Sequence, residues 1–84
     1  MYSVRFHRSA IRELERLDVR MHRRVGRAID GLASDPRPDG AVKLRGTSDL
    51  WRLRVGDFRV VYQMRDDVLV VLIIRVRHRR EAYR

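Results

Sequence analysis

The chain has 84 residues and a formal net charge of +9, with 20 lysine and arginine residues against 11 acidic ones. This length suits one small domain, and the absence of cysteine excludes disulfides and cysteine-based zinc sites. The longest apolar run, Val68–Ile74, is too short to span a bilayer, and the N-terminus lacks the layout of a signal peptide. These features predict a cytoplasmic protein of one domain, residues 1–84, that makes no membrane contact and binds an acidic partner such as nucleic acid.

Two compositional features limit this interpretation. Lys43 is the only lysine, so genome base composition is an alternative explanation for the arginine content, and a solvated basic surface is the alternative to nucleic-acid binding. The three histidines, His7, His22 and His78, do not have the spacing of metal ligands. No metal and no cofactor is therefore expected.

The first half of the chain predicts one strand and two helices. Polar and apolar residues alternate over Tyr2–His7, which predicts a short strand. Ser9 is the expected N-cap of a first helix and Asp18 of a second. The apolar residues that recur at helical spacing are Ile11, Leu14 and Leu17 in the first helix, and Met21, Val25, Ala28, Ile29 and Leu32 in the second. Two prolines within Asp35–Gly40 end the helical half.

The second half predicts strands separated by turns. The expected strands are Val42–Arg45, Leu50–Val55, Phe58–Arg65 and Val68–Val76. The resulting fold class is α+β, in the order β-α-α-β-β-β. A two-helix hairpin would pack on one face of a small, mostly antiparallel twisted sheet and leave the other face open.

A tight hairpin turn is predicted at Gly56-Asp57. With this turn, Arg54 lies opposite Arg59, and Arg52 shares their face of the sheet. The other face carries Trp51, Leu53, Val55, Phe58, Val60 and Tyr62, and we expect it to belong to the core. Because like charges directly opposite each other destabilise a sheet, the arginine face predicts a polyanionic partner.

The register of the last strand stays open at this stage. A two-residue turn at Asp66-Asp67 places Ile74 beside Arg59, whereas a three-residue turn places Arg75 there. The chain then ends in a basic segment with a tyrosine, RVRHRREAYR over residues 75–84. Arginine forks bind phosphate and an aromatic ring stacks on an unpaired base, so this segment suits an RNA site. The alternative is a frayed basic tail.

Three motifs together resemble the RelE toxins of the RelE/ParE toxin–antitoxin superfamily. They are KLRG at residues 43–46, LWRLRVGDFRVVYQ at 50–63 and HRREAYR at 78–84, and the similarity covers essentially the whole chain. The resemblance implies a RelE-like microbial RNase fold and the toxin half of a type II toxin–antitoxin pair. It also implies a ribosome-dependent endoribonuclease that cleaves mRNA in the ribosomal A site.

The resemblance also assigns roles to residues. Arg52 and Arg54 match two basic active-site positions that are lysines in the best-known members, and Arg59 matches an arginine thought to stabilise the phosphate. Arg79 and Tyr83 match the C-terminal arginine and tyrosine. Further basic residues are expected to bind RNA: Lys43, Arg45, Arg77 and Arg80.

The implied mechanism needs no metal. The RNA 2′-hydroxyl attacks the adjacent phosphorus and leaves a cyclic phosphate and a free 5′-hydroxyl. Since arginine is effectively always charged, Arg52 and Arg54 are expected to act as electrostatic clamps rather than as a general base. His78 is a candidate for proton transfer because of its pKa range, and the alternative is a surface residue among arginines.

The expected partners follow from the same resemblance. They are an acidic RelB-like antitoxin, the A site of the 30S ribosomal subunit with its mRNA and ribosomal RNA, and operator DNA through the antitoxin only. The main alternative is a ParE-like inhibitor of DNA gyrase without chemistry of its own. A third possibility is a degenerate toxin that only binds, because both lysines are replaced.

Overall fold

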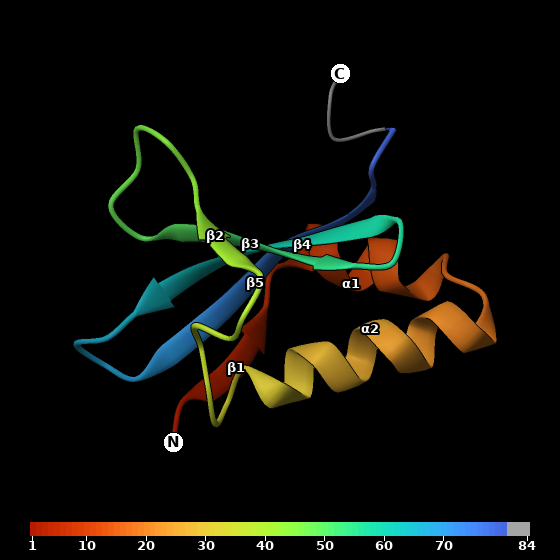
Figure 1. The fold of residues 1–84 in the computed structure, drawn as a ribbon. Helices are drawn as coiled ribbons and strands as arrows, with labels where there is room; N and C mark the ends of the chain where they lie inside the picture. Colours follow the sequence, from red (N-terminus) through yellow and green to blue (C-terminus); the bar gives the residue numbers. More distant parts are fainter. Residues whose placement is uncertain (81–84) are drawn as a thin grey trace.

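The computed structural model describes residues 1–80 and contains five strands and two helices. The strands are β1 (Ser3–Phe6), β2 (Ala41–Lys43), β3 (Leu50–Val55), β4 (Phe58–Arg65) and β5 (Val70–His78), and the helices are α1 (Arg8–Glu15) and α2 (Val19–Gly31). The strands form one sheet in the order β1-β5-β4-β3-β2, in which only the β1–β5 pair is parallel. Both helices lie on the same side of this sheet (Figure 1). The predicted α+β class, with a two-helix hairpin on a mostly antiparallel sheet, is confirmed, and all five strands predicted by range are present, so that four strands rather than three follow the helices.

The core lies between the helices and one face of the sheet. Val25 and Ile29 of α2 and Leu32, which caps this helix, are almost completely buried in one cluster with Val60 and Tyr62 of β4. These residues come from the predicted helix stripe and the predicted apolar hairpin face. The helices therefore cover the side of the sheet that the sequence pattern assigned to the core.

Tyr62 ties the proline loop to this core. Its ring is fully buried, and its hydroxyl donates a 2.8 Å hydrogen bond to the carbonyl of Pro36. Burial raises the pKa of Tyr62 to about 12, so the phenol stays protonated and remains a donor. The expected role of Tyr62 in core packing is confirmed.

The first helix begins differently from the prediction. Its N-cap is His7, whose ring nitrogen Nδ1 accepts a hydrogen bond from the backbone N–H of Ser9 at 3.2 Å. The Ser9 hydroxyl donates instead to the carbonyl of Ile74 in β5, at 2.8 Å. Ser9 as N-cap was therefore wrong, because its hydroxyl serves a contact between helix and sheet. Asp18 as N-cap of α2 is confirmed, since its carboxylate accepts from the N–H of Met21 at 2.8 Å.

The register of β5 matches neither of the two predicted alternatives. Four residues, Asp66 to Leu69, connect the paired residues Arg65 and Val70, and Leu69 adopts a positive φ of 53°. A bulge then leaves Ile74 without a partner, because Val61 pairs with Arg75 whereas Tyr62 pairs with Ile73. The longer turn and the bulge together place Arg77 opposite Arg59, where the sequence predicted Ile74 or Arg75.

A polar cluster joins three distant parts of the chain at the β4–β5 turn. The Tyr2 hydroxyl donates to the Asp66 carboxylate, and Arg37 forms a 2.8 Å ion pair with the same group. The Arg37 guanidinium also lies 5.6 Å from the centre of the Trp51 ring. Hydrogen bonds from Tyr2 and Arg37 lower the pKa of Asp66, so this carboxylate is charged over the whole neutral range.

No helix within residues 1–80 is long and apolar enough to cross a membrane.

We expect Asp66→Asn to lower the melting temperature at neutral pH but not in acid. Because folding lowers the pKa of Asp66, its negative charge stabilises the native state at pH values above its ordinary pKa of 3.8. This contribution is lost as the pH falls through the lowered value. Thermal unfolding of both proteins, followed by circular dichroism from about pH 2 to about pH 8, measures the difference. An equal loss at both ends of this range would contradict a charge-dependent role.

Candidate nucleic-acid interface

The exposed face of the β3–β4 hairpin carries two directly opposed arginines. Arg54 pairs with Arg59 and Val55 with Phe58, as the Gly56-Asp57 turn predicts. Gly56 has a φ of +61°, which glycine adopts without strain. The Nε of Arg54 donates a 3.0 Å hydrogen bond to the carbonyl of Gly56, which holds this side chain beside the turn. The predicted hairpin register is confirmed.

The neighbouring strand adds a third arginine to this pair. Arg59 lies opposite Arg77 of β5 in the sheet register, so Arg54, Arg59 and Arg77 form a row across three adjacent strands. We refer to these three residues as the arginine row. Each pair of like charges in such a row lowers the stability of the sheet by an amount on the order of 0.2–1 kcal/mol. The arrangement is stable only because other interactions offset this repulsion, and anion binding would relieve it.

Glu13 of α1 provides part of the compensation at the end of the row. Its Oε2 accepts a 3.1 Å hydrogen bond from the Nε of Arg77 and lies 3.8 Å from the Nη1 of Arg75. Its other oxygen, Oε1, accepts from the backbone N–H of Val76 at 2.9 Å. The Glu13 side chain is only 16% exposed, so it closes the edge of β5 beyond the end of β1 and holds Arg77 in place.

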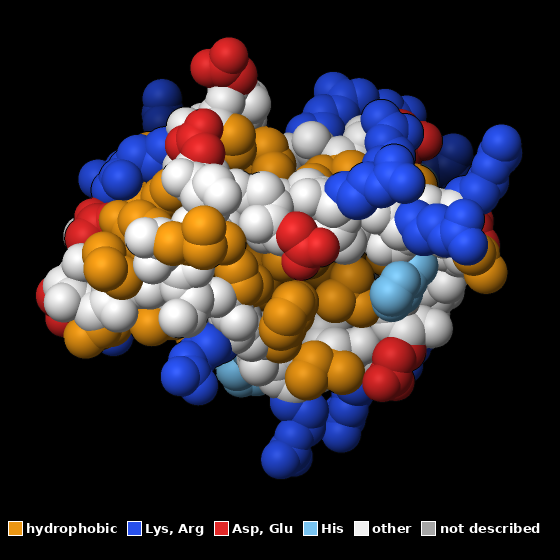
Figure 2. Space-filling model, turned by 90° about the horizontal axis from the view of Figure 1, so that it is seen from below, with side chains coloured by type: hydrophobic (Ala, Val, Ile, Leu, Met, Phe, Trp, Pro, Cys, Tyr) orange, Lys and Arg blue, Asp and Glu red, His pale blue; other side chains and the backbone are white. Residues whose placement is uncertain are grey.

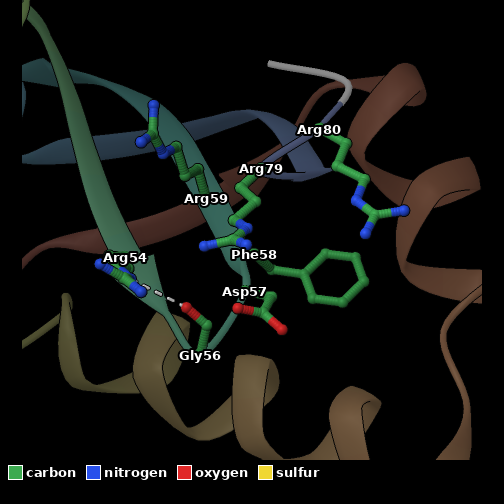
Figure 3. A pocket seen from close by; sticks show the side chains of 7 residues that line it. All are labelled: Arg54, Gly56, Asp57, Phe58, Arg59, Arg79 and Arg80. Carbon is green, nitrogen blue, oxygen red and sulfur yellow. Dashed lines mark hydrogen bonds between the residues drawn. The ribbon is translucent and has the colours of Figure 1, made fainter. Parts of the chain in front are cut away.

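A pocket of about 300 Å³ lies around the hairpin turn, and we refer to it as the arginine pocket. It is lined by Arg54, Gly56, Asp57, Phe58, Arg59, Arg79 and Arg80. The chain reaches it directly after β5, because the N–H of Arg79 donates a 2.7 Å hydrogen bond to the carbonyl of Asp57. Figure 3 shows Arg54 and Arg79 on the same side of the turn, whereas the Phe58 ring points away from them.

The structure brings most of the predicted arginines of the site together, but not all of them. Arg54, Arg59, Arg79 and Arg80 meet at the arginine pocket, and Arg77 lies at the end of the row. Arg52 lies on the same face as Arg54 but two residues farther from the turn, where it pairs with Val61. It does not line the pocket. Tyr83 lies outside the described residues. Its expected role therefore stays a prediction.

The two basic residues of the KLRG motif lie apart from the arginine pocket. Lys43 pairs with Trp51, so its side chain leaves the sheet on the face opposite to Arg52. Arg45 is exposed in the segment after β2. Neither residue belongs to the arginine row or lines the arginine pocket, and their predicted contact with RNA stays a prediction.

His78 also lies on the helix side of the sheet. It pairs with Phe58, with the two rings edge to face at a centroid distance of 5.3 Å. Its Nδ1 accepts a 3.3 Å hydrogen bond from the N–H of Arg80, and it lines a separate pocket next to Glu13. The structure thus places the candidate proton-transfer group on the opposite face from the arginine row. Its role in proton transfer stays a prediction.

The chemistry of the arginine pocket is that of an anion site. Among residues 1–80, its lining contains four guanidinium groups, one carboxylate and no lysine or histidine. Guanidinium forks bind phosphate through paired N–H donors and keep their charge at all physiological pH values. Within residues 1–80, no group of three or more histidine, cysteine or acidic side chains is arranged to hold a metal ion.

Glu13 is the contributor that the sequence did not reveal. Its position in the middle of an amphipathic helix is typical of a solvated acidic residue. The contact with Arg77 is 64 residues away along the chain and depends on the bulge in β5. A single sequence contains no signal for such a pairing.

Comparison with known proteins agrees with this fold and identifies the family of the chain. Residues 4–83 match the family described as ParE toxin of type II toxin-antitoxin system, parDE. Toxin RelG of Mycobacterium tuberculosis is 33% identical over 99% of this chain and 97% of its own length. The mRNA interferase toxin RelE of Escherichia coli K12 is 33% identical over 98% of this chain and 90% of its own.

A solved structure extends the likeness to three dimensions. The archaeal RelE–RelB complex from Pyrococcus horikoshii OT3 contains a chain that superposes with a TM-score of 0.83 at 32% identity, covering 93% of this chain and 94% of that one. The family match and the named relatives thus point to one group of proteins. The chain belongs to the RelE/ParE superfamily and is a RelE-like toxin of a type II toxin–antitoxin system.

Proposed function

We propose that this toxin is a ribosome-dependent endoribonuclease that cleaves mRNA in the ribosomal A site. The observation that carries the proposal is the arginine pocket, where Arg54, Arg59, Arg79 and Arg80 surround a space of about 300 Å³. A relative at 33% identity is named an mRNA interferase toxin, and a scissile phosphate is the anion that such an enzyme must hold. The site of action then lies in the cytoplasm, on the 30S subunit with its mRNA and ribosomal RNA.

In the proposed reaction the attacking group comes from the RNA itself. The 2′-oxygen forms a bond to the adjacent phosphorus, and the bond from phosphorus to the 5′-oxygen of the next nucleotide breaks. The 2′-hydroxyl loses a proton and the leaving 5′-oxygen gains one, which gives a cyclic phosphate and a 5′-hydroxyl. The charge that builds up on the phosphate is stabilised by guanidinium groups, so the reaction needs no metal in this site.

The arginines of this chain would bind different parts of the RNA, according to their positions in the fold. Arg54 and Arg59 are opposed across the hairpin and would bind the non-bridging phosphate oxygens. Arg79, fixed through its backbone to Asp57, would approach from the side of the turn. Arg52 would bind the phosphate of a neighbouring nucleotide, and Tyr83 would stack on a base or transfer a proton.

The same surface suits inhibition by an acidic antitoxin. Three of the similar solved structures are complexes of RelE-type toxins with RelB-type antitoxins, from Pyrococcus horikoshii OT3, Mycobacterium tuberculosis and Escherichia coli. We propose that a cognate RelB-like antitoxin offers carboxylates to the arginine row and that operator DNA is contacted only through it. A gyrase inhibitor of ParE type has weaker support: the matching family model is described as ParE toxin, but the curated relatives are named RelE or RelG and the similar solved structures are RelE-type toxins.

We expect Arg59→Ala or Arg79→Ala to reduce mRNA cleavage on translating ribosomes by a factor of about 10²–10³, as for loss of one oxyanion donor. Primer extension on ribosome-bound mRNA measures this rate. Arg12→Ala is a suitable control because Arg12 is an exposed arginine of α1 that lines none of the described pockets. Intact mRNA with the native toxin, together with inhibition of gyrase supercoiling, would favour the ParE-like alternative.

A second variant tests the positioning of Arg77. Glu13→Gln keeps an oxygen that accepts from Val76 but removes the charge that holds Arg77. We expect cleavage at saturating ribosomes to slow by about tenfold, or about 1.4 kcal/mol. The melting temperature should change little because the backbone contact is kept. A lower melting temperature with an unchanged rate would show that Glu13 serves the fold only.

A further inference from the structure

The exposed side of α2 carries a regular stripe of arginines. Arg20, Arg23, Arg24 and Arg27 recur at spacings of three and four residues, so they lie along one side of the helix. We refer to these four residues as the α2 stripe. All four are exposed, and within residues 1–80 none of them forms an ion pair. Figure 2, seen from the side of α2, shows basic side chains gathered at the upper right and acidic side chains scattered singly.

The α2 stripe is costly for the isolated helix. Like charges at these spacings destabilise a helix by about 0.2–0.5 kcal/mol for each pair. The first turn of α2 contains no acidic residue that would offset this repulsion, apart from the capping Asp18. Binding of a polyanion along the helix removes the cost, and the repeat over seven residues spans about 10 Å of the helix axis.

Two grooves connect the α2 stripe to the arginine pocket. Arg54 and Gly56 line the arginine pocket and also a groove of about 400 Å³ between α2 and the hairpin. Arg24 and Arg27 line that groove and also a third one, of about 660 Å³, along the start of α2. Neighbouring hollows thus share arginines, and the basic surface is continuous from Arg79 to Arg20.

Arg24 forms the junction between the two surfaces. A Cβ atom placed on Gly56 would lie 3.0 Å from the Nη1 of Arg24, so this guanidinium rests against the hairpin turn. The turn carries the arginine pocket on one side and meets α2 on the other. An RNA strand that leaves the pocket past Gly56 therefore meets Arg24 first and the rest of the α2 stripe next.

The charged lining of the groove at the start of α2 favours RNA over a protein segment. A protein interface needs exposed apolar anchors at its centre. In the groove between α2 and the hairpin, Leu53 and Val55 are only 9% and 7% exposed, so they offer little apolar surface. Five of the six residues that line the groove at the start of α2 are charged, and four of those are arginines. Phosphates, which are bound by charge and hydrogen bonds alone, fit this lining.

We propose that the α2 stripe is a second RNA-binding site that holds the phosphate backbone of the substrate strand as it continues beyond the arginine pocket. This inference rests on the proposed ribonuclease function. It assigns Arg20, Arg23, Arg24 and Arg27 to binding and not to cleavage. The stripe contributes affinity that is independent of base sequence and depends on salt concentration.

The test compares two arginine pairs with the same spacing. Arg23→Gln/Arg27→Gln removes two charges from the α2 stripe, and Arg8→Gln/Arg12→Gln removes two from an equally spaced pair on α1, outside the described pockets. The probes are 2′-O-methyl RNAs of about four and about fifteen nucleotides, which cannot be cleaved because the attacking hydroxyl is blocked. Fluorescence anisotropy over a series of salt concentrations gives affinity and salt slope.

We expect the α2 variant to bind the longer RNA about tenfold more weakly, with a salt slope smaller by about 1.4, or 0.7 for each phosphate contact. Its affinity for the short RNA should match that of the native toxin, and the α1 variant should bind both RNAs like the native toxin. In mRNA cleavage on ribosomes, the α2 variant should have a higher KM than the native toxin and the same kcat.

Two outcomes would overturn the proposal. In one, the α2 and α1 variants lose affinity for the longer RNA equally, which indicates only a general effect of net charge. In the other, the α2 variant keeps full RNA affinity but binds an acidic peptide more weakly, which makes α2 a protein-binding surface. Cleavage by the native toxin is measured separately through Arg59→Ala, so failure of the ribonuclease function is distinguishable from failure of the second site.

Discussion

The pairing of β4 with β5 is the constraint on which the rest of the molecule depends. Residue by residue, this pairing decides which side chains face the helices and which face solvent, since a shift of one residue exchanges the two sets. The bulge at Ile74 allows Val71, Ile73 and Val76 all to be buried in the core. The same bulge places Arg77 opposite Arg59. Core packing and the arginine row are thus two results of one irregularity in the sheet.

The acidic residues are distributed in a way that supports this arrangement. Glu13 holds Arg75 and Arg77 at the edge of β5, and Asp66 holds Arg37 at the far end of the strand. These ion pairs lie around the sheet rather than in the arginine pocket, where Asp57 is the only carboxylate among the lining residues that the structure describes. The fold therefore uses its carboxylates to fix arginines in position at the margins and leaves positive charge concentrated at the hairpin turn.

Much of the fold could be predicted from local sequence signals. The Gly56-Asp57 turn defines the hairpin register, Asp18 begins α2, and the spacing of Val25, Ile29 and Leu32 identifies the buried side of that helix. These features depend on residues that are close in the chain. The opposition of Arg54 and Arg59 followed from the turn alone.

The remaining features depend on contacts between distant residues. β5 is apolar on both faces, so alternation does not define its register, and neither the left-handed Leu69 nor the bulge has a residue signature such as glycine. Ser9 caps no helix because Ile74 competes for its hydroxyl, and Glu13 gains its role only when α1 meets β5. His78 was expected near the arginines by sequence proximity, yet strand alternation turns it to the other face.

The absence of lysine from the arginine pocket has a consequence for control of this protein. A guanidinium group keeps its proton at every physiological pH, and the acetylation that neutralises lysine does not act on arginine. Neither a rise in pH within the physiological range nor lysine acetylation can therefore remove the charge of these guanidinium groups. In the proposed pairing, the antitoxin masks this charge by occupying the pocket, so the ratio of antitoxin to toxin would determine how much of this surface is exposed.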